Sequence, residues 1–243
     1  MSSGKKLLLF DIDGTLVDTE GAGLESLRDG FYEAFPAFVE LPFPALDLGG
    51  ATDGGVAMFL FEHFGLADSV EIRGHFFRSY SGHLKRRLRE FRIAGKGRVL
   101  PGVPALLNAL RDEGGHEIAV LTGNIEQGAW TKLRHFGLDG HFRFGAFGDD
   151  HHDRDELGLL AVKRAADHTG ITFAPHEVVV IGDTPKDVAC ARALGARSLA
   201  VATGTVPRSE LEASKPDLVL DDLADSASAM EALGKVFLAR EGC

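Results

Sequence analysis

Cysteine is scarce in this sequence, and its scarcity excludes one class of protein. The 243 residues include two cysteines, Cys190 and Cys243, which are too few for a disulfide framework and suit a reducing compartment. Long apolar runs are also missing, since none approaches the roughly 20 residues that a membrane-spanning helix needs. Lys5-Lys6 followed by Leu7 to Phe10 loosely resembles a signal peptide, but the run is too short and an acid follows it directly. We therefore expect a cytoplasmic protein with no membrane partner.

Basic residues are outnumbered by acids. The sequence contains 26 lysines and arginines against 36 aspartates and glutamates, which gives a formal net charge of −10 at pH 7. Such a chain has no extended basic surface left to neutralise a phosphate backbone, so we expect no nucleic-acid partner. A small phosphorylated substrate is not excluded, because a local metal site outweighs distant, screened charge.

Two acids follow the first apolar run, where a buried strand should end. In Asp11-Ile12-Asp13-Gly14-Thr15, the side chains of Asp11 and Asp13 point the same way if the chain is extended. Their like charges raise at least one pKa unless a cation or proton intervenes, and a bound divalent metal relieves that repulsion. Gly14 permits a sharp turn, and the Thr15 hydroxyl can donate to an oxyanion or cap the turn. The alternative is an ordinary Asp-Gly turn.

A second strand end with acids lies far downstream. Val178 to Ile181 predicts a strand buried on both faces, and the segment from Gly182 to Asp187 follows it at once. Ligands bind outside the carboxyl ends of parallel strands, so we expect Asp183 to share a crevice with Asp11 and to bind metal. Asp187 is a further candidate, in support of the ligands, although the segment also has the threonine, proline and acid of an ordinary helix start.

A third strand end carries milder chemistry. Ile118 to Leu121 runs into Thr122-Gly123-Asn124, where a hydroxyl and the free N–H groups of a following helix could hold phosphate oxygens. Thr122 is therefore a candidate catalytic residue, and Gly123 and Asn124 are candidates for substrate binding. The alternative is a simple helix cap.

Strand and helix patterns alternate through most of the sequence. After the first strand we expect strands near residues 117–121, 142–147, 178–181, 198–202 and 217–220, with helices that end at glycines between them. This alternation predicts an α/β fold, a doubly wound (Rossmann-like) parallel sheet. We assign residues 1–17 and 98–243 to this core, which leaves residues 18–97 as an insert.

The three motifs together resemble those of the haloacid dehalogenase-like hydrolases, in particular a phosphoglycolate phosphatase-like branch with a helical cap. Asp11-x-Asp13-Gly14-Thr15 is similar to the first motif of that family, and Leu121-Thr122-Gly123-Asn124 is similar to the second. Gly182-Asp183-x-x-x-Asp187 is similar to the fourth. The likeness extends from Leu7 to about Gly204.

The resemblance implies a role for each acid. The residue that matches Asp11 attacks phosphorus, and the one that matches Asp13 acts as general acid and base. Magnesium is held by Asp11, the backbone carbonyl of Asp13 and Asp183, and we include Asp187 among the candidate metal residues. The chemistry agrees, because an aspartyl-phosphate splits the displacement into two easier steps and an oxygen-ligated cation screens the carboxylate from the phosphoryl group.

The third motif of the family departs from its usual form here. The family has a lysine, often followed by proline, whereas the segment from His151 to Leu157 has neither. The cation that pairs with the nucleophile must then be Arg154 or Lys163. We favour Arg154, because it lies just before the predicted helix and its fork suits phosphate oxygens, whereas Lys163 can be explained as a solvated helix position. An arginine orients and neutralises but does not readily lend a proton.

The insert, residues 18–97, has helical periodicity and no clear strand, which predicts an α-helical bundle. We expect its phenylalanines to form its core, including Phe31, Phe35, Phe59, Phe64 and Phe76. In the family such an insert is a mobile cap that closes over the substrate. We expect Thr52 and Asp53, in a glycine-rich stretch of the insert, to face the leaving group; an ordinary loop with a helix cap is the alternative.

Asp13 narrows the reaction, because relatives that hydrolyse carbon–halogen bonds carry another residue at that position. We therefore expect a phosphatase that uses Mg²⁺ and acts on a small phosphorylated metabolite. A phosphomutase acting on a sugar phosphate keeps the same acid and stays an alternative, as does a phospho-ligand binding protein without turnover. The sequence predicts neither the individual substrate nor an oligomeric state.

Overall fold

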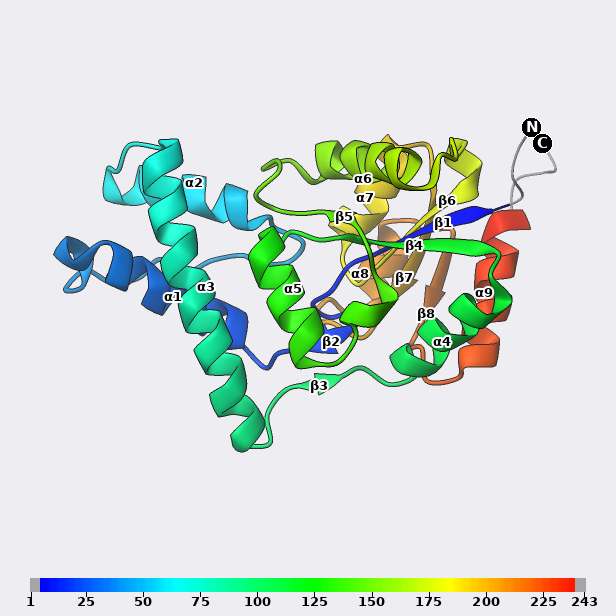
Figure 1. Ribbon diagram of the computed structural model, residues 1–243, viewed down its shortest axis with the longest axis horizontal. Coiled ribbons are helices and arrows are strands. Elements are labelled where there is room, and N and C mark those ends of the chain that lie inside the picture. Colours follow the sequence, from blue (N-terminus) through cyan, green and yellow to red (C-terminus); the bar gives the residue numbers. More distant parts are fainter. Residues whose placement is uncertain (1–4, 239–243) are drawn as a thin grey trace.

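A parallel sheet forms the centre of the protein. The computed structural model describes residues 5–238, and its main sheet has the strand order β5-β4-β1-β6-β7-β8, with all neighbours parallel (Figure 1). The strands are β1 (Lys6–Phe10), β4 (His116–Leu121), β5 (Gly145–Ala146), β6 (Val178–Gly182), β7 (Arg197–Val201) and β8 (Leu218–Leu220). The predicted α/β class is therefore confirmed. The strand expected at 142–147 is reduced to two residues at the edge of the sheet.

Helices cover both faces of this sheet because alternate strand residues point to opposite sides. Leu8 and Phe10 pack in one core with residues of α4 (Val103–Glu113), α5 (Glu126–His135) and α9 (Ser226–Leu238). Leu7 and Leu9 pack in a second core with residues of α6 (Arg154–Thr169) and α7 (Pro185–Ala193). The short helix α8 (Arg208–Ala213) packs beside β7. Within residues 5–238, three 3₁₀ turns complete the elements: η1 (Pro36–Phe38), η2 (Asp139–His141) and η3 (Pro175–Glu177).

The register of the three central strands brings their carboxyl ends to one level. Phe10 pairs with Val120 of β4 on one side and with Ile181 of β6 on the other. The residues that follow these strands therefore emerge together at the same edge of the sheet. The sequence motifs lie there, as the positions of the strand ends predicted.

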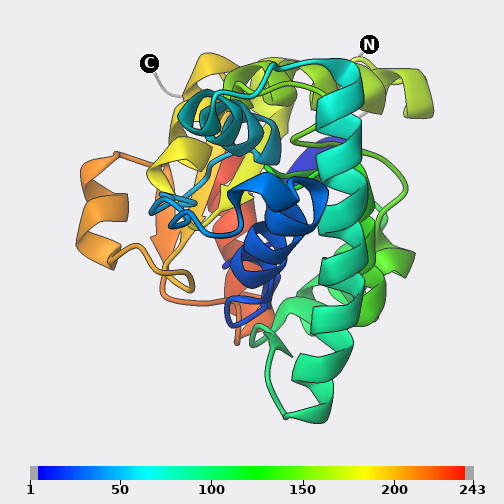
Figure 2. The same cartoon turned by 90° about the vertical axis from the view of Figure 1, so that its left-hand side faces the viewer.

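A helical layer lies beside that edge, at the left of Figure 1 and toward the viewer in Figure 2. It consists of α1 (Ala22–Ala34), α2 (Asp53–Phe64) and α3 (Val70–Ile93). The chain enters it through β2 (Val17–Asp18) and leaves through β3 (Arg98–Val99), which pair antiparallel. The helices have their own apolar core, in which Phe31 and Phe76 are fully buried. Phe59 is 45% exposed, so its expected place in that core is wrong; it lies on the outer face of α2 beside His63.

Cys190 lies on α7 and is buried, whereas Cys243 falls outside the described residues. In the described part of the chain, every helix is too short or too polar to cross a membrane.

Candidate active site

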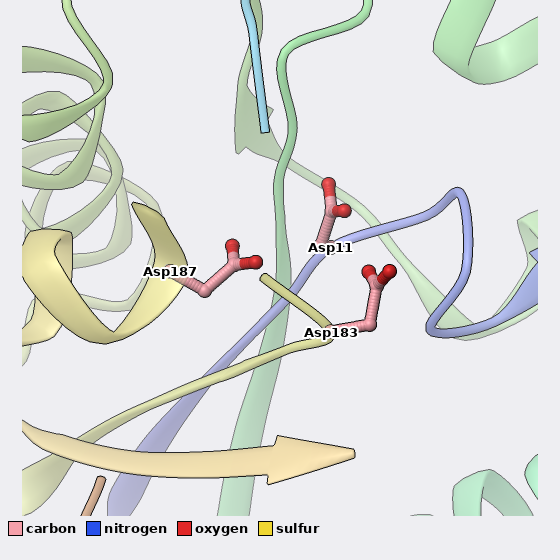
Figure 3. A group of neighbouring side chains, drawn as sticks. All are labelled: Asp11, Asp183 and Asp187. Atoms are coloured by element: carbon pink, nitrogen blue, oxygen red, sulfur yellow. The ribbon is translucent and has the colours of Figure 1, made fainter. Parts of the chain in front are cut away.

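Three aspartates from two strand ends meet at the edge of the sheet. Asp11 follows β1, while Asp183 and Asp187 follow β6, and each offers a carboxylate oxygen within 4.8 Å of the others (Figure 3). All three are buried, with at most 6% of each residue exposed. The predicted convergence of Asp11 and Asp183 on one crevice is thus present in the structure.

Glycines and a threonine fix Asp183 in place. A Cβ on Gly14 would lie 2.3 Å from Asp183 Oδ2, and a Cβ on Gly204 would lie 1.7 Å from the same atom, so a side chain at either position would displace the Asp183 carboxylate. Gly14 also has a φ of +78°, in the region that favours glycine. The Thr15 hydroxyl donates to Asp183 Oδ1 at 3.1 Å. Thr15 therefore supports a candidate metal ligand in this structure, rather than an oxyanion.

The crowding of carboxylates changes their acidity. Burial raises the pKa of Asp183 to about 8, and the neighbouring Asp11 and Asp187 carboxylates push it in the same direction. Burial also raises the pKa of Asp11 to about 6, although the Arg154 guanidinium opposes this shift. A hard divalent cation held by oxygens of Asp11 and Asp183 would relieve this repulsion, so the donor set fits magnesium.

Arg154 is the cation of this cluster. It begins α6, and its Nη2 lies 3.2 Å from Asp11 Oδ1 and 2.5 Å from Asp187 Oδ1. The same atom donates to the Leu121 carbonyl at 3.3 Å. Among the described residues nothing accepts a hydrogen bond from the buried Arg154 Nε. Arg154 therefore lies beside the candidate nucleophile, and its Nε–H is not used in a hydrogen bond by any described residue.

Lys163 does not reach the site, which corrects its place among the candidates. It is exposed nine residues further along α6, about 13.5 Å from the start of the helix at 1.5 Å per residue. Its neighbours there line a separate apolar hollow near the start of β6, including Phe173, Pro175 and Val178. Arg154 and Lys163 thus lie toward opposite ends of the sheet.

Both carboxylate oxygens of Asp187 already have protein partners. Oδ2 accepts from the backbone N of Thr184 at 3.0 Å and from its hydroxyl at 2.7 Å, while Oδ1 accepts from Arg154. This is the helix-capping arrangement that the sequence left open. Asp187 lies close enough to share a cation, but its contacts make it a support for Arg154, and Asp11 and Asp183 remain the better metal candidates.

The second motif forms the wall on the other side of Asp13. The buried Thr122 hydroxyl accepts from Asn124 Nδ2 at 2.8 Å, and the same amide donates to Asp13 Oδ2 at 2.7 Å. A Cβ on Gly123 would lie 1.9 Å from the Ala51 carbonyl oxygen, so the backbone of the helical layer approaches this loop closely. Thr122, Gly123 and Asn124 all line a cavity between this edge of the sheet and the helical layer.

Lys132 is a residue that our sequence analysis missed. Its Nζ lies 2.6 Å from Asp13 Oδ2 and 2.6 Å from Asn124 Oδ1, and its side chain is 3% exposed. A signal was present, because Lys132 falls at a position of the apolar stripe that faces the interior. That stripe consists of Ile125, Gly128, Ala129, Lys132 and Leu133.

Thr52 and Asp53 take different places. Thr52 caps α2, because its hydroxyl accepts from Gly55 N at 3.0 Å and donates to the His152 carbonyl at 2.7 Å. It does not line the cavity, which corrects the expectation that it faces a leaving group. Asp53 does line the cavity, but its Oδ2 accepts from Ile125 N at 2.9 Å. Burial raises the pKa of Asp53 to about 6.

A cavity of about 530 Å³ lies between the edge of the sheet and the helical layer. From the sheet side it is lined by Asp11, Asp13, Thr122, Lys132, Arg154 and Asp183. From the helical layer it is lined by Leu24, Leu27, Asp53, Val56 and Tyr80. The acids, Lys132 and Arg154 therefore face one space large enough for a small molecule.

Fold and site together define a Rossmann-like α/β protein that has buried aspartates at the carboxyl ends of its central strands and a helical insert after its first strand. The family model for the haloacid dehalogenase-like hydrolases matches residues 5–195 of the chain. The chain is therefore a member of this family.

Similar proteins agree with this assignment. The chain is 27% identical to "Probable phosphatase IndB" of Dickeya dadantii (strain 3937), over 96% of both chains. It is 28% identical to a phosphoglycolate phosphatase of Agrobacterium fabrum, over 92% of this chain and 91% of the relative. A solved hydrolase structure from Pseudomonas syringae shares the fold, with a TM-score of 0.69 at 22% identity over 94% of this chain and 99% of that one.

Proposed function

We propose that this protein is a Mg²⁺-dependent phosphatase that hydrolyses a small phosphorylated metabolite through an aspartyl-phosphate on Asp11. The observation that supports this most strongly is that the buried carboxylates of Asp11 and Asp183 lie close together at one edge of the sheet, beside Arg154. A buried acid cluster with a single partnering arginine has an excess of negative charge, which a divalent cation would balance. The names of the relatives, both phosphatases, point the same way.

The magnesium ion would be held by Asp11, Asp183 and the backbone carbonyl of Asp13. When bound, it would neutralise charge on the phosphoryl oxygens and on Asp11, so that two anions can approach each other. Arg154 adds a fixed positive charge next to Asp11, at 3.2 Å from its Oδ1. Because Arg154 is held in turn by Asp187, its position does not depend on a bound substrate.

Asp11 and Asp13 then divide the chemistry. A carboxylate oxygen of Asp11 forms a bond to phosphorus while the bond from phosphorus to the leaving oxygen breaks, and Asp13 gives its proton to that oxygen. In the second step Asp13 takes a proton from water as the water oxygen attacks phosphorus. Inorganic phosphate leaves, Asp11 is restored, and Asp13 again carries a proton.

The helical layer serves as the cap of this site. Its residues form one wall of the cavity, and the start of α2 is joined to the sheet side by backbone hydrogen bonds. Asp53 N donates to the Gly123 carbonyl at 2.6 Å, and Gly54 N donates to the Gly148 carbonyl at 3.0 Å. A wall of this kind excludes water from the phosphoryl group and limits the size of the substrate.

The decisive experiment is a screen of phosphorylated metabolites for release of inorganic phosphate, with and without Mg²⁺. Asp11→Asn is the test variant, and Asp112→Asn, on the exposed side of α4, is the matched control. We expect Mg²⁺-dependent release by the wild type and the control, and loss of release in Asp11→Asn. Release that survives in Asp11→Asn would place the nucleophile elsewhere, and an isomeric phosphate ester in place of free phosphate would indicate a phosphomutase.

A further inference from the structure

We propose that Lys132 is a positioning residue that anchors Oδ2 of Asp13 and thereby reserves Oδ1 for proton transfer. This inference rests on the proposed function, since it names the atom that serves the general acid and base. It also gives Arg154 and Lys132 different roles. Arg154 contacts Asp11 and Asp187, whereas Lys132 contacts Asp13 and Asn124.

The two oxygens of Asp13 have different surroundings. Oδ2 accepts from Lys132 Nζ at 2.6 Å and from Asn124 Nδ2 at 2.7 Å. Among the described residues no donor contacts Oδ1, although the side chain is 39% exposed and lines the cavity. A carboxylate has acceptor capacity on both oxygens, so Oδ1 is left to bind the group that exchanges the proton.

The anchor is a closed triangle of side chains. Lys132 Nζ donates to Asn124 Oδ1 at 2.6 Å, Asn124 Nδ2 donates to Asp13 Oδ2, and Lys132 completes the triangle with its own bond to that oxygen. Asn124 Nδ2 donates to the Thr122 hydroxyl as well, which fixes the orientation of the amide. Each member of the triangle therefore holds the other two.

Lys132 is unusual because it is almost completely buried. Lysine is rarely buried unless it is paired, and the buried ammonium of Lys132 donates hydrogen bonds to two side chains of the site. Its ammonium has three N–H donors and uses two of them among the described residues. The lysine thus approaches Asp13 from the side of α5, opposite to the side from which Arg154 approaches Asp11.

The physical advantage is a fixed geometry for the proton. Asp13 lies on the turn after β1, where an unanchored carboxylate could rotate toward the positive charge of Arg154 beside Asp11. A misplacement of about 1 Å can lower a rate about 10²-fold. By holding Oδ2, Lys132 keeps Oδ1 facing the cavity through both proton transfers.

The test compares leaving groups that do and do not need a proton. An alkyl phosphate from the screen needs protonation, whereas 2,4-dinitrophenyl phosphate has a leaving group that departs without it. We expect Lys132→Met to lower kcat/KM about 10²-fold on the alkyl phosphate and less than about fivefold on the dinitrophenyl ester. The variant should also release a burst of dinitrophenolate, because the later activation of water by Asp13 is slowed. Arg134→Met, on the exposed side of the same helix, is the control and should match the wild type.

Other outcomes overturn the proposal in distinguishable ways. An equal loss on both substrates would mean that Lys132 acts on phosphate binding or on the fold, and no loss on either would remove its role. A wild type that hydrolyses neither substrate would instead contradict the proposed function. If Lys132→Met fails to fold, Lys132→Leu, which likewise has no donor for Asp13, takes its place. A crystal structure of the variant that folds should show Asp13 Oδ2 released from its present position, and an unmoved carboxylate would contradict the anchor.

Discussion

Arg154 Nη2 lies 2.5 Å from Asp187 Oδ1, and both side chains are almost completely buried. Asp187 thus gives the arginine a fixed partner inside the protein. The second contact of that guanidinium is with Asp11, so the charge beside the candidate nucleophile is set by the fold.

Arg154→Met should damage both activity and stability, because it removes the cation that pairs with the buried carboxylates of Asp11 and Asp187. Removing one member of a buried ion pair typically destabilises by about 3–5 kcal/mol, which urea unfolding would measure. We expect activity to fall at least about 10²-fold. Lys163→Met, an exposed position on the same helix, should leave both quantities unchanged; a comparable loss of phosphate release in that variant would contradict our choice of Arg154.

Asp183→Asn should stabilise the protein in the absence of metal and abolish stabilisation by Mg²⁺. Burial raises the pKa of Asp183 to about 8, from 3.8. The folded state therefore holds a proton that the unfolded state releases, and stability falls as the pH rises through that window. The variant should gain on the wild type between pH 4 and pH 8 in EDTA, as measured by thermal unfolding. An Mg²⁺-dependent rise in Tm that persists in Asp183→Asn would remove Asp183 from the metal site.

Asp53→Asn should show a similar but smaller pH effect. The pKa of Asp53 is raised by burial from 3.8 to about 6, so the wild type loses stability as the pH rises between these values. Asparagine keeps an acceptor for Ile125 N but does not titrate. The free energy of unfolding of the variant, relative to the wild type, should therefore rise by about 2 kcal/mol between pH 4 and pH 7. Parallel curves for the two proteins, measured by urea unfolding in EDTA, would show that Asp53 is not perturbed.

Gly123→Ala should disturb the contact between the helical layer and the second motif. Its Cβ would lie 1.9 Å from the Ala51 carbonyl oxygen, which is backbone and can only move with the layer. We expect KM to rise several-fold and the Tm to fall. Gly82→Ala is the matched control, because a Cβ there meets nothing within 4 Å and alanine is favoured by about 1 kcal/mol in a helix. A Tm for Gly123→Ala that equals the wild type would show that the loop has more room than the structure gives it.

The sheet and its acidic edge could be predicted because both depend on local patterns. Apolar runs such as Val178 to Ile181 mark buried strands, and parallel strands place their carboxyl ends together, so Asp11 and Asp183 were found from their positions alone. Which charged side chains pair with which could not be predicted in the same way. These pairs join elements that are far apart in the sequence, as Lys132 and Asp13 are, with a separation of 119 residues.

Thr52 shows a second limit. A threonine before a helix is equally suited to cap that helix or to face a ligand, and both alternatives were open from the sequence. The choice depends on where the first turn of α2 lies, and in the structure it lies against the loop that ends at His152. The register of that contact is set by close backbone approach at Gly54 and Gly123, which no local pattern encodes.

The antiparallel pair β2 and β3 has a consequence for how such proteins diversify. Val17 pairs with Val99 and Asp18 with Arg98, so the chain departs from the sheet and returns to it at neighbouring points. A segment whose two ends meet can be lengthened, shortened or transplanted from a relative without changing the distance that the remaining chain must span. Under the proposed function, substrate recognition can therefore change by exchange of this segment while the residues at the sheet edge stay the same.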